Sequence, residues 1–220
     1  MSVVENNDKH IAMEFITLAI GLVTALFVHE LGHLFAARCC RIHVGAVAIG
    51  VGPALLSVRD RDGTHWTMHA FPIGGSCRFG HELPTRKPPN RLSFNEATGL
   101  QRASIFAAGP LSSLIFAVAL VFALIAAEGW TIVDAASPAR LDVGMITAVA
   151  IFSLLVAVFN LLPLLPLDGG QLFLIALEAA GKTASAQARA RFDAWSRTIL
   201  RVGGFVVAAL ATWFATQSWS

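Results

Sequence analysis

Long runs of apolar residues recur along a chain whose other segments are polar. Two of them, 103–127 and 143–167, extend for 25 residues each without a Lys, Arg, Asp or Glu. A third run, at about 15–37, contains one charged residue, Glu30, and a fourth, at about 199–216, is the shortest. Because about 20 apolar residues in a helix cross a bilayer, the pattern predicts about four transmembrane helices.

A different pattern lies between the first two predicted spans. Residues 44–59 are rich in Val, Ala, Ile and Leu, and residues 64–70 alternate as a half-buried strand does. Asp62–Gly63 is typical of a tight turn between them, and 72–75 breaks the strand pattern. We expect a small β-hairpin or sheet over about 43–80 that lies against or dips into the membrane, where the backbone must pair its polar groups.

The expected fold class is therefore mainly α: a polytopic membrane protein with a membrane-associated re-entrant β-hairpin or sheet, in one domain over residues 1–220. Composition agrees, since 55% of the residues are hydrophobic, 14% are charged and the mean hydropathy is +0.66. These values exclude disordered, collagen-like and disulfide-rich classes. A net charge of +2 argues against a basic nucleic-acid-binding protein, so the bilayer is the expected partner.

Basic residues are distributed unevenly among the predicted loops. Nine lie between the first two spans and five between the last two, but only one precedes the first span and one joins the second span to the third. Lys and Arg near membrane spans accumulate on the cytoplasmic side. We therefore expect the loops 38–102 and 168–201 to be cytoplasmic and both termini to be extracytoplasmic.

The first span carries the sequence His29-Glu30-Leu31-Gly32-His33. Helical residues four positions apart differ by about 40° in azimuth, so both imidazoles can reach one metal ion. Zinc suits these ligands, and Glu30 lies beside them as a general base for a zinc-activated water. Ionisable side chains at membrane depth are costly and usually functional. The alternative is a polar patch between packed helices, with Glu30 neutral.

A catalytic zinc takes three protein ligands, so one more is needed. The best candidate is Asp168, which follows the third span and emerges on the cytoplasmic side, toward which the active site is expected to lie. Pro163 and Pro166 prevent a regular helix before it, and Gly169–Gly170 let the backbone bend closely. The competing interpretation is an ordinary carboxylate at a helix N-terminus. Asn160 is a candidate donor to a substrate carbonyl, or else a hydrogen-bonding residue between helices.

These residues resemble the site-2 protease family of intramembrane zinc metalloproteases over about 15–175. His29 to His33 is similar to the histidine–glutamate motif of that family. Asn160 to Gly170 resembles its second motif, in which an Asn and prolines precede Leu-Asp-Gly. Four shorter segments resemble its re-entrant β-loop and the start of its next helix: 50–53, 71–75, 101–103 and 108–110.

The resemblance implies that His29, His33 and Asp168 bind Zn²⁺, that Glu30 is the general base, and that Asn160 assists substrate binding. It implies a membrane-embedded zinc metalloendopeptidase. Its substrates would be transmembrane segments of membrane-bound regulators such as anti-sigma factors, cleaved after a first cut elsewhere in regulated intramembrane proteolysis.

The chain departs from the family pattern at two places. Ser113 stands where many members carry Asn, and only the fifteen residues 128–142 join the second and third spans, where many members insert a PDZ domain. Substrate selection through such a domain in that connection is therefore not expected.

Two other functions are compatible with these residues. One is a catalytically silent, zinc-binding membrane scaffold of the same fold, against which the complete set of Glu30 and the three expected ligands argues. The other is a metal transporter, which would place ionisable residues in several spans, whereas the second span has none.

Overall fold

A computed structural model describes residues 2–79, 91–131, 143–181 and 187–199. The chain divides into two compact units, 1–160 and 161–220, and each is described by itself.

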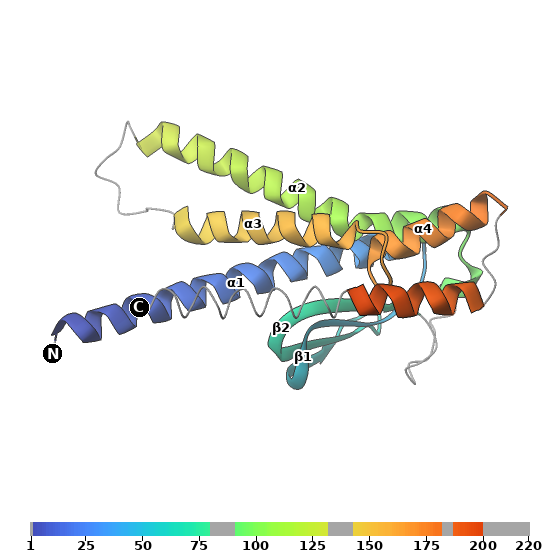
Figure 1. Ribbon diagram of the computed structural model, residues 1–220, viewed down its shortest axis with the longest axis horizontal. Coiled ribbons are helices and arrows are strands. Elements are labelled where there is room, and N and C mark those ends of the chain that lie inside the picture. Colours follow the sequence, from blue (N-terminus) through green and yellow to red (C-terminus); the bar gives the residue numbers. More distant parts are fainter. Residues whose placement is uncertain (1, 80–90, 132–142, 182–186, 200–220) are drawn as a thin grey trace. The chain divides into compact units, whose positions relative to one another are not determined.

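Three long helices make up most of the first unit (Figure 1): α1 (Ser2–Cys39), α2 (Gly99–Thr131) and α3 (Val143–Asn160). Each contains a segment long and apolar enough to cross a membrane. Three of the predicted spans are thus confirmed as candidate membrane helices. The fourth, at about 199–216, lies almost entirely outside the described residues.

The third helix is shorter than its apolar run. It ends at Asn160, whereas the hydrophobic pattern predicted a span up to residue 167. Pro163 explains the difference, because its ring disfavours a helical conformation at the preceding residue and it has no N–H to donate. Apolar composition continues beyond Asn160, but the hydrogen-bonding pattern of the helix does not.

The predicted small sheet is confirmed and consists of two long strands, β1 (Val44–Arg59) and β2 (His65–Phe79). They pair as an antiparallel hairpin from Arg59↔His65 to Ala54↔His69. Both strands bend, so that residues 46–49 have partners on either side, among 65–68 and among 75–78.

The strand pattern does not end at 72–75 as expected, because β2 continues through this segment. Gly74 has a φ of +77°, a left-handed conformation that glycine adopts without a steric penalty. The glycine bends the strand and lets it continue on the other side of β1.

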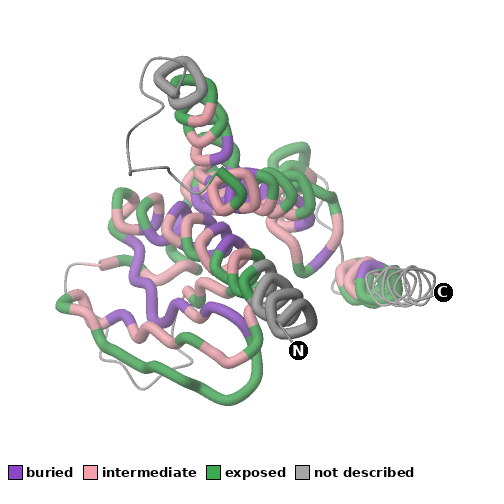
Figure 2. The backbone as a smooth tube through the Cα atoms, turned by 90° about the vertical axis from the view of Figure 1, so that its left-hand side faces the viewer, coloured by how far each residue is buried: buried purple, intermediate pink, exposed green. Residues whose placement is uncertain are grey.

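Residues 44–50 of β1, its inner half, are mostly buried, and residues 51–59, its outer half, are exposed. Figure 2 shows the same division, with purple and green stretches along one strand. The buried half packs with the end of α1 and the start of α2 in one apolar cluster of Leu34, Ala37, Ile42, Val44, Val47, Ala97 and Ile105. The exposed outer part presents large apolar side chains of Val51, Leu55, Leu56 and Val58.

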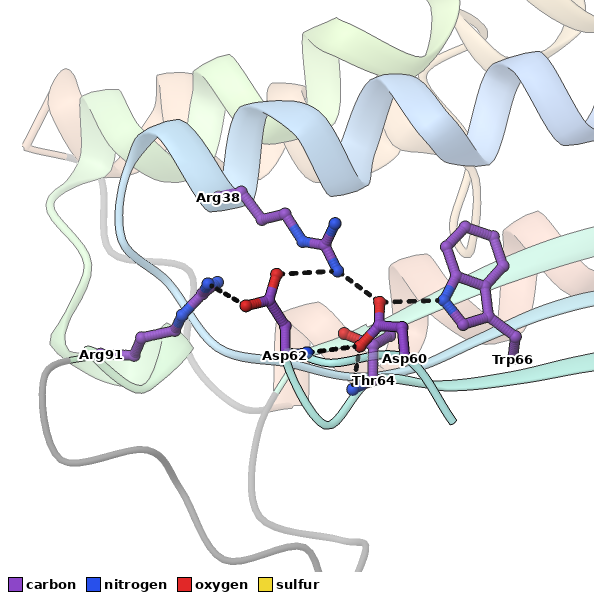
Figure 3. A network of polar contacts seen from close by, with 6 residues as sticks. All are labelled: Arg38, Asp60, Asp62, Thr64, Trp66 and Arg91. Carbon is purple, nitrogen blue, oxygen red and sulfur yellow. Dashed lines mark hydrogen bonds and ion pairs between the residues drawn. The ribbon is translucent and has the colours of Figure 1, made fainter. Parts of the chain in front are cut away.

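A polar network holds the turn of the hairpin against the end of α1 (Figure 3). Asp60 Oδ1 accepts hydrogen bonds from the backbone N–H groups of Asp62 and Thr64, at 3.0 and 2.9 Å. Asp60 Oδ2 accepts from Trp66 Nε1 at 3.1 Å and pairs with Arg38 Nη2 at 2.5 Å. One carboxylate therefore shapes the turn and ties it to the helix.

Two opposing effects act on the pKa of Asp60. Partial burial raises the pKa, but hydrogen bonds from Trp66 and Thr64 and the guanidinium of Arg38 outweigh this effect, so the pKa lies below its usual value of 3.8. A lowered pKa in the folded state means that the ionised carboxylate stabilises the fold.

The second unit contains α4 (Asp168–Ala179) and a helical segment at 187–199. An ion pair between Glu178 and Arg189 and a ring contact between Phe173 and Phe192 join these helices.

One short 3-10 helix, η1 (Phe94–Glu96), precedes α2 in the first unit.

Replacement of Asp60 with Asn should destabilise the protein by about 1 kcal/mol at neutral pH, because the charge opposite Arg38 is lost and an amide N–H faces other donors. The contribution of Asp60 is fully present above its unfolded-state pKa and is lost as pH falls through its lower folded-state pKa. The stability difference between parent and variant should therefore shrink below about pH 4. Thermal unfolding in detergent, followed by circular dichroism, measures it.

Asp62→Asn is the matched control, since the Asp62 side chain is 41% exposed and forms ion pairs with Arg38 and Arg91. Asp62→Asn should lower the free energy of unfolding by less than Asp60→Asn does. Equal losses for the two variants would show that Asp60 has no special part in the turn.

Candidate metal centre

Two buried histidines on α1 point their ring nitrogens at one place. His29 and His33 are each 4% exposed, and their Nε2 atoms lie 3.2 Å apart. Two nitrogens bound to one tetrahedral zinc at 2.0–2.1 Å would be separated by about 3.3 Å. The spacing of this pair therefore fits a shared zinc ion.

The other nitrogen of each ring is held by α2. His33 Nδ1 lies 2.8 Å from the carbonyl oxygen of Ile105, and His29 Nδ1 lies 3.2 Å from Ser113 Oγ. A carbonyl can only accept, so His33 carries its proton on Nδ1 and, when neutral, offers the lone pair of Nε2. Such a contact on the outer nitrogen is the usual way in which proteins orient a metal-binding imidazole.

Small residues allow α1 and α2 to approach closely at this level. A Cβ on Gly109 would lie 2.2 Å from His33 Nε2, and a Cβ on Gly32 would lie 2.4 Å from the carbonyl oxygen of Ala108. Ser112 Oγ donates a hydrogen bond to the carbonyl oxygen of Val28 at 3.0 Å. The space for an imidazole therefore exists because residue 109 has no side chain.

The sheet closes over the acidic residue of the motif. Glu30 is 4% exposed, and a Cβ on Gly75 of β2 would lie only 2.4 Å from its Oε1. The backbone of β2 can come this close only because Gly75 has no side chain. Glu30 is thus enclosed between its own helix and the bent strand.

The two remaining predicted site residues lie at the ends of helices. Asn160 is the last residue of α3, and its Nδ2 donates to the carbonyl oxygen of Val156 at 2.9 Å. Asp168, in the second unit, is the first residue of α4. The residue before it, Leu167, is the N-cap of that helix. Its part as the third ligand stays a prediction.

Sequence reasoning missed the groups that surround the histidine pair. The carbonyl of Ile105 has no side-chain signal, so no reading of residue types could have found it. Gly75 and Gly109 were noted only within the segments that resemble a family. Ser113 was noted as a departure, although its hydroxyl lies against His29.

A comparison with protein families decides the relationship. The model of peptidase family M50 matches residues 17–147 and 136–200, which together are most of the chain. The chain belongs to peptidase family M50. The resemblance to site-2 proteases is thereby confirmed, and with three apolar helices this M50 protein is an integral membrane protein.

Similar proteins occur in several bacteria. The M50 chain is 38% identical over 103 residues to Protease RseP of Yersinia pestis, and 40% identical over 101 residues to the regulator of sigma-E protease RseP of Salmonella typhimurium (strain 14028s / SGSC 2262). These matches cover 46% and 45% of this chain and 22% of each relative.

A Brucella suis biovar 1 protein that carries the name of a zinc metalloprotease is 35% identical over 125 residues, or 51% of this chain and 33% of that one. The matches thus span a third or less of these relatives' length. The solved site-2 protease from Methanocaldococcus jannaschii is 19% identical, with a TM-score of 0.48 over 88% of this chain and 67% of that one.

Gly109→Ala should weaken zinc binding by at least about tenfold, because the new methyl group would occupy the place of the His33 imidazole. Competition with a chromophoric chelator, on the purified protein in detergent, measures the affinity.

Gly21→Ala is a control on the same helix, α1, where the added Cβ faces α3 and comes no closer than 3.2 Å, to the ring of Phe152. It should leave zinc affinity unchanged. Unaltered binding by Gly109→Ala would mean that the metal does not bind at His33.

Proposed function

We propose that this chain is an intramembrane zinc endopeptidase. The observation that carries the proposal is the pair of buried imidazoles whose Nε2 atoms lie 3.2 Å apart, with Glu30 between them in sequence, on a helix able to cross a membrane. Membership of peptidase family M50 supports a hydrolytic role, and zinc is the metal that the name of the Brucella relative implies.

We assign the three ligand positions to His29, His33 and Asp168. Each can offer one ligand atom, a ring nitrogen from either histidine or a carboxylate oxygen from Asp168. Three protein ligands leave a position for water, as in catalytic zinc sites generally.

The local structure around Asp168 suits a fixed ligand. A Cβ on Gly169 would lie 2.3 Å from the carbonyl oxygen of Leu161, and a Cβ on Gly170 would lie 2.5 Å from the carbonyl carbon of Leu164. The segment after α3 therefore folds tightly onto the first turn of α4. A carboxylate at that turn has little freedom to move, which favours preorganised binding.

Glu30 acts as the general base in this proposal. Zinc, when bound, supplies Lewis-acid activation of the attacking water and of the scissile carbonyl. Glu30 takes one proton from the water as the water oxygen forms a bond to the carbonyl carbon. Glu30 then passes that proton to the leaving nitrogen as the peptide C–N bond breaks. Burial of Glu30 beneath β2 limits its contact with bulk water.

The substrate would be a transmembrane segment that is locally unwound, since a regular helix keeps its carbonyls hydrogen-bonded. The bent sheet can receive such a segment as an added strand. Its residues 75–79 pair with 44–49 on one side, and Gly75 lies against Glu30. We assign to Asn160 the positioning of that segment through its second amide N–H, since one already donates to Val156.

Membrane-bound regulatory proteins are the substrate class that we propose. One relative is named a regulator of sigma-E protease, which suggests targets such as anti-sigma factors. Regulated intramembrane proteolysis would then be the cellular setting, with a first cut made by another protease.

The site would face the cytoplasmic leaflet. The proposal rests on the basic residues of the loops 38–102 and 168–201, and on the exposed apolar outer part of β1, which we place at the membrane.

Glu30→Gln should reduce cleavage of a transmembrane peptide by at least about a hundredfold while zinc content stays unchanged, because the base is lost and the ligands remain. Asp168→Asn should lower zinc affinity as well as cleavage. Peptide cleavage in detergent and elemental analysis provide the two readouts.

Glu178→Gln is a control in α4, since Glu178 pairs with Arg189. It should retain both cleavage and zinc. A parent protein that binds zinc without cleaving any of a panel of transmembrane peptides would favour the silent scaffold, and full activity of Glu30→Gln would exclude Glu30 as the base.

Cys39 can test the orientation, because it is exposed at the end of α1. In a double variant with Cys40→Ser and Cys77→Ser, which keeps Cys39, a membrane-impermeant maleimide should label the protein in inverted vesicles and not in intact cells. Labelling in intact cells would reverse the proposed topology.

A further inference from the structure

Ser113 is a fully buried residue of α2 with its hydroxyl at the outer nitrogen of a proposed ligand. It is 0% exposed, and its Oγ lies 3.2 Å from His29 Nδ1. We propose that Ser113 is a positioning residue, which accepts the Nδ1 proton of His29 in a hydrogen bond and so directs the lone pair of Nε2 toward the metal. The inference rests on the proposed zinc site.

The two histidines differ in how their tautomers are set. His33 faces the carbonyl oxygen of Ile105, which accepts only, so its proton must lie on Nδ1. His29 faces a hydroxyl, which can donate or accept. Metal binding at His29 Nε2 requires the proton on Nδ1, and the Ser113 hydroxyl, 3.2 Å from that nitrogen, can accept it.

The surrounding packing fixes the position of this hydroxyl. Ser112, the preceding residue, donates to the carbonyl oxygen of Val28, which directly precedes His29 in α1. A Cβ on Gly32 would lie 2.3 Å from Ser112 Oγ, so the helices are in close contact here. Adjacent serines of α2 thus contact adjacent residues of α1, one through the backbone and one through the imidazole.

The contact also predicts that removal of the Ser113 hydroxyl weakens the affinity for zinc. Without an acceptor at Nδ1, the His29 ring can rotate or carry its proton on Nε2, which removes the lone pair from the metal position. Loss of a group that orients a metal-binding histidine generally weakens metal affinity by about 10–100-fold.

The test compares Ser113→Ala, Ser113→Thr and Ser153→Ala in the full chain purified in detergent. Ser153 is an equally buried serine, in α3, and serves as the matched control. Zinc affinity is measured by competition with a chromophoric chelator. We expect a loss of about tenfold or more for Ser113→Ala, retention for Ser153→Ala, and substantial rescue by the hydroxyl of Ser113→Thr.

A second measurement does not need the metal. ¹⁵N NMR of histidine-labelled, metal-free protein distinguishes the two tautomers of a neutral imidazole. In the parent, His33 should be protonated on Nδ1. His29, whose Nε2 also faces His33 Nε2 at 3.2 Å, should carry its proton on Nδ1 to an extent that Ser113→Ala lowers, while the His33 signals stay unchanged. A variant that is merely less stable would not produce this selective change.

The outcomes separate the inference from the proposed function. If the parent binds zinc and Ser113→Ala binds it equally well with unshifted His29 signals, Ser113 has no positioning role. An equal loss in Ser153→Ala also overturns the inference, since any buried serine would then matter. If the parent binds no zinc, the proposed function fails, and the tautomer signals alone decide whether Ser113 orients His29.

Discussion

Close contact between α1 and α2 is the constraint on which the candidate site depends. A helix with two histidines four positions apart can hold a metal only if both rings are turned the same way. The neighbouring helix turns them, through the carbonyl of Ile105 and the hydroxyl of Ser113. Both contacts require the helices to touch, and Gly32 and Gly109 provide the room, since a Cβ at either position would overlap the opposite helix.

The sheet is the second element that shapes the candidate site. Its inner half completes the apolar cluster at the end of α1, and its turn is tied to Arg38 through Asp60. These attachments hold β2 where the backbone at Gly75 covers Glu30. A carboxylate in such an enclosed place is costly unless it has a function or a partner, which agrees with a role in proton transfer. The attachment of the hairpin turn to α1 and the enclosure of Glu30 by β2 thus result from the same packing arrangement.

Several features were predictable because they depend on local patterns. Apolar runs, one of them containing Glu30, predicted the three helices, and the histidine spacing predicted a metal-binding face on α1. Other features depended on competing local effects. α3 stops at Asn160 because Pro163 overrides continued apolar composition, and β2 continues past residue 73 because Gly74 adopts a φ of +77°. In both cases backbone geometry, rather than hydrophobicity, decided where the element ended.

The sequence by itself determined the class of protein, the membrane-spanning character of its helices, and the residue types able to hold zinc and move a proton. These follow from composition and periodicity, which act over a few neighbouring residues. Only the tertiary structure decided that Ile105 and Ser113 orient the histidines and that Gly75 lies against Glu30. Those contacts join residues more than forty positions apart. They involve backbone atoms and missing side chains, which leave no signal in a pattern of residue types.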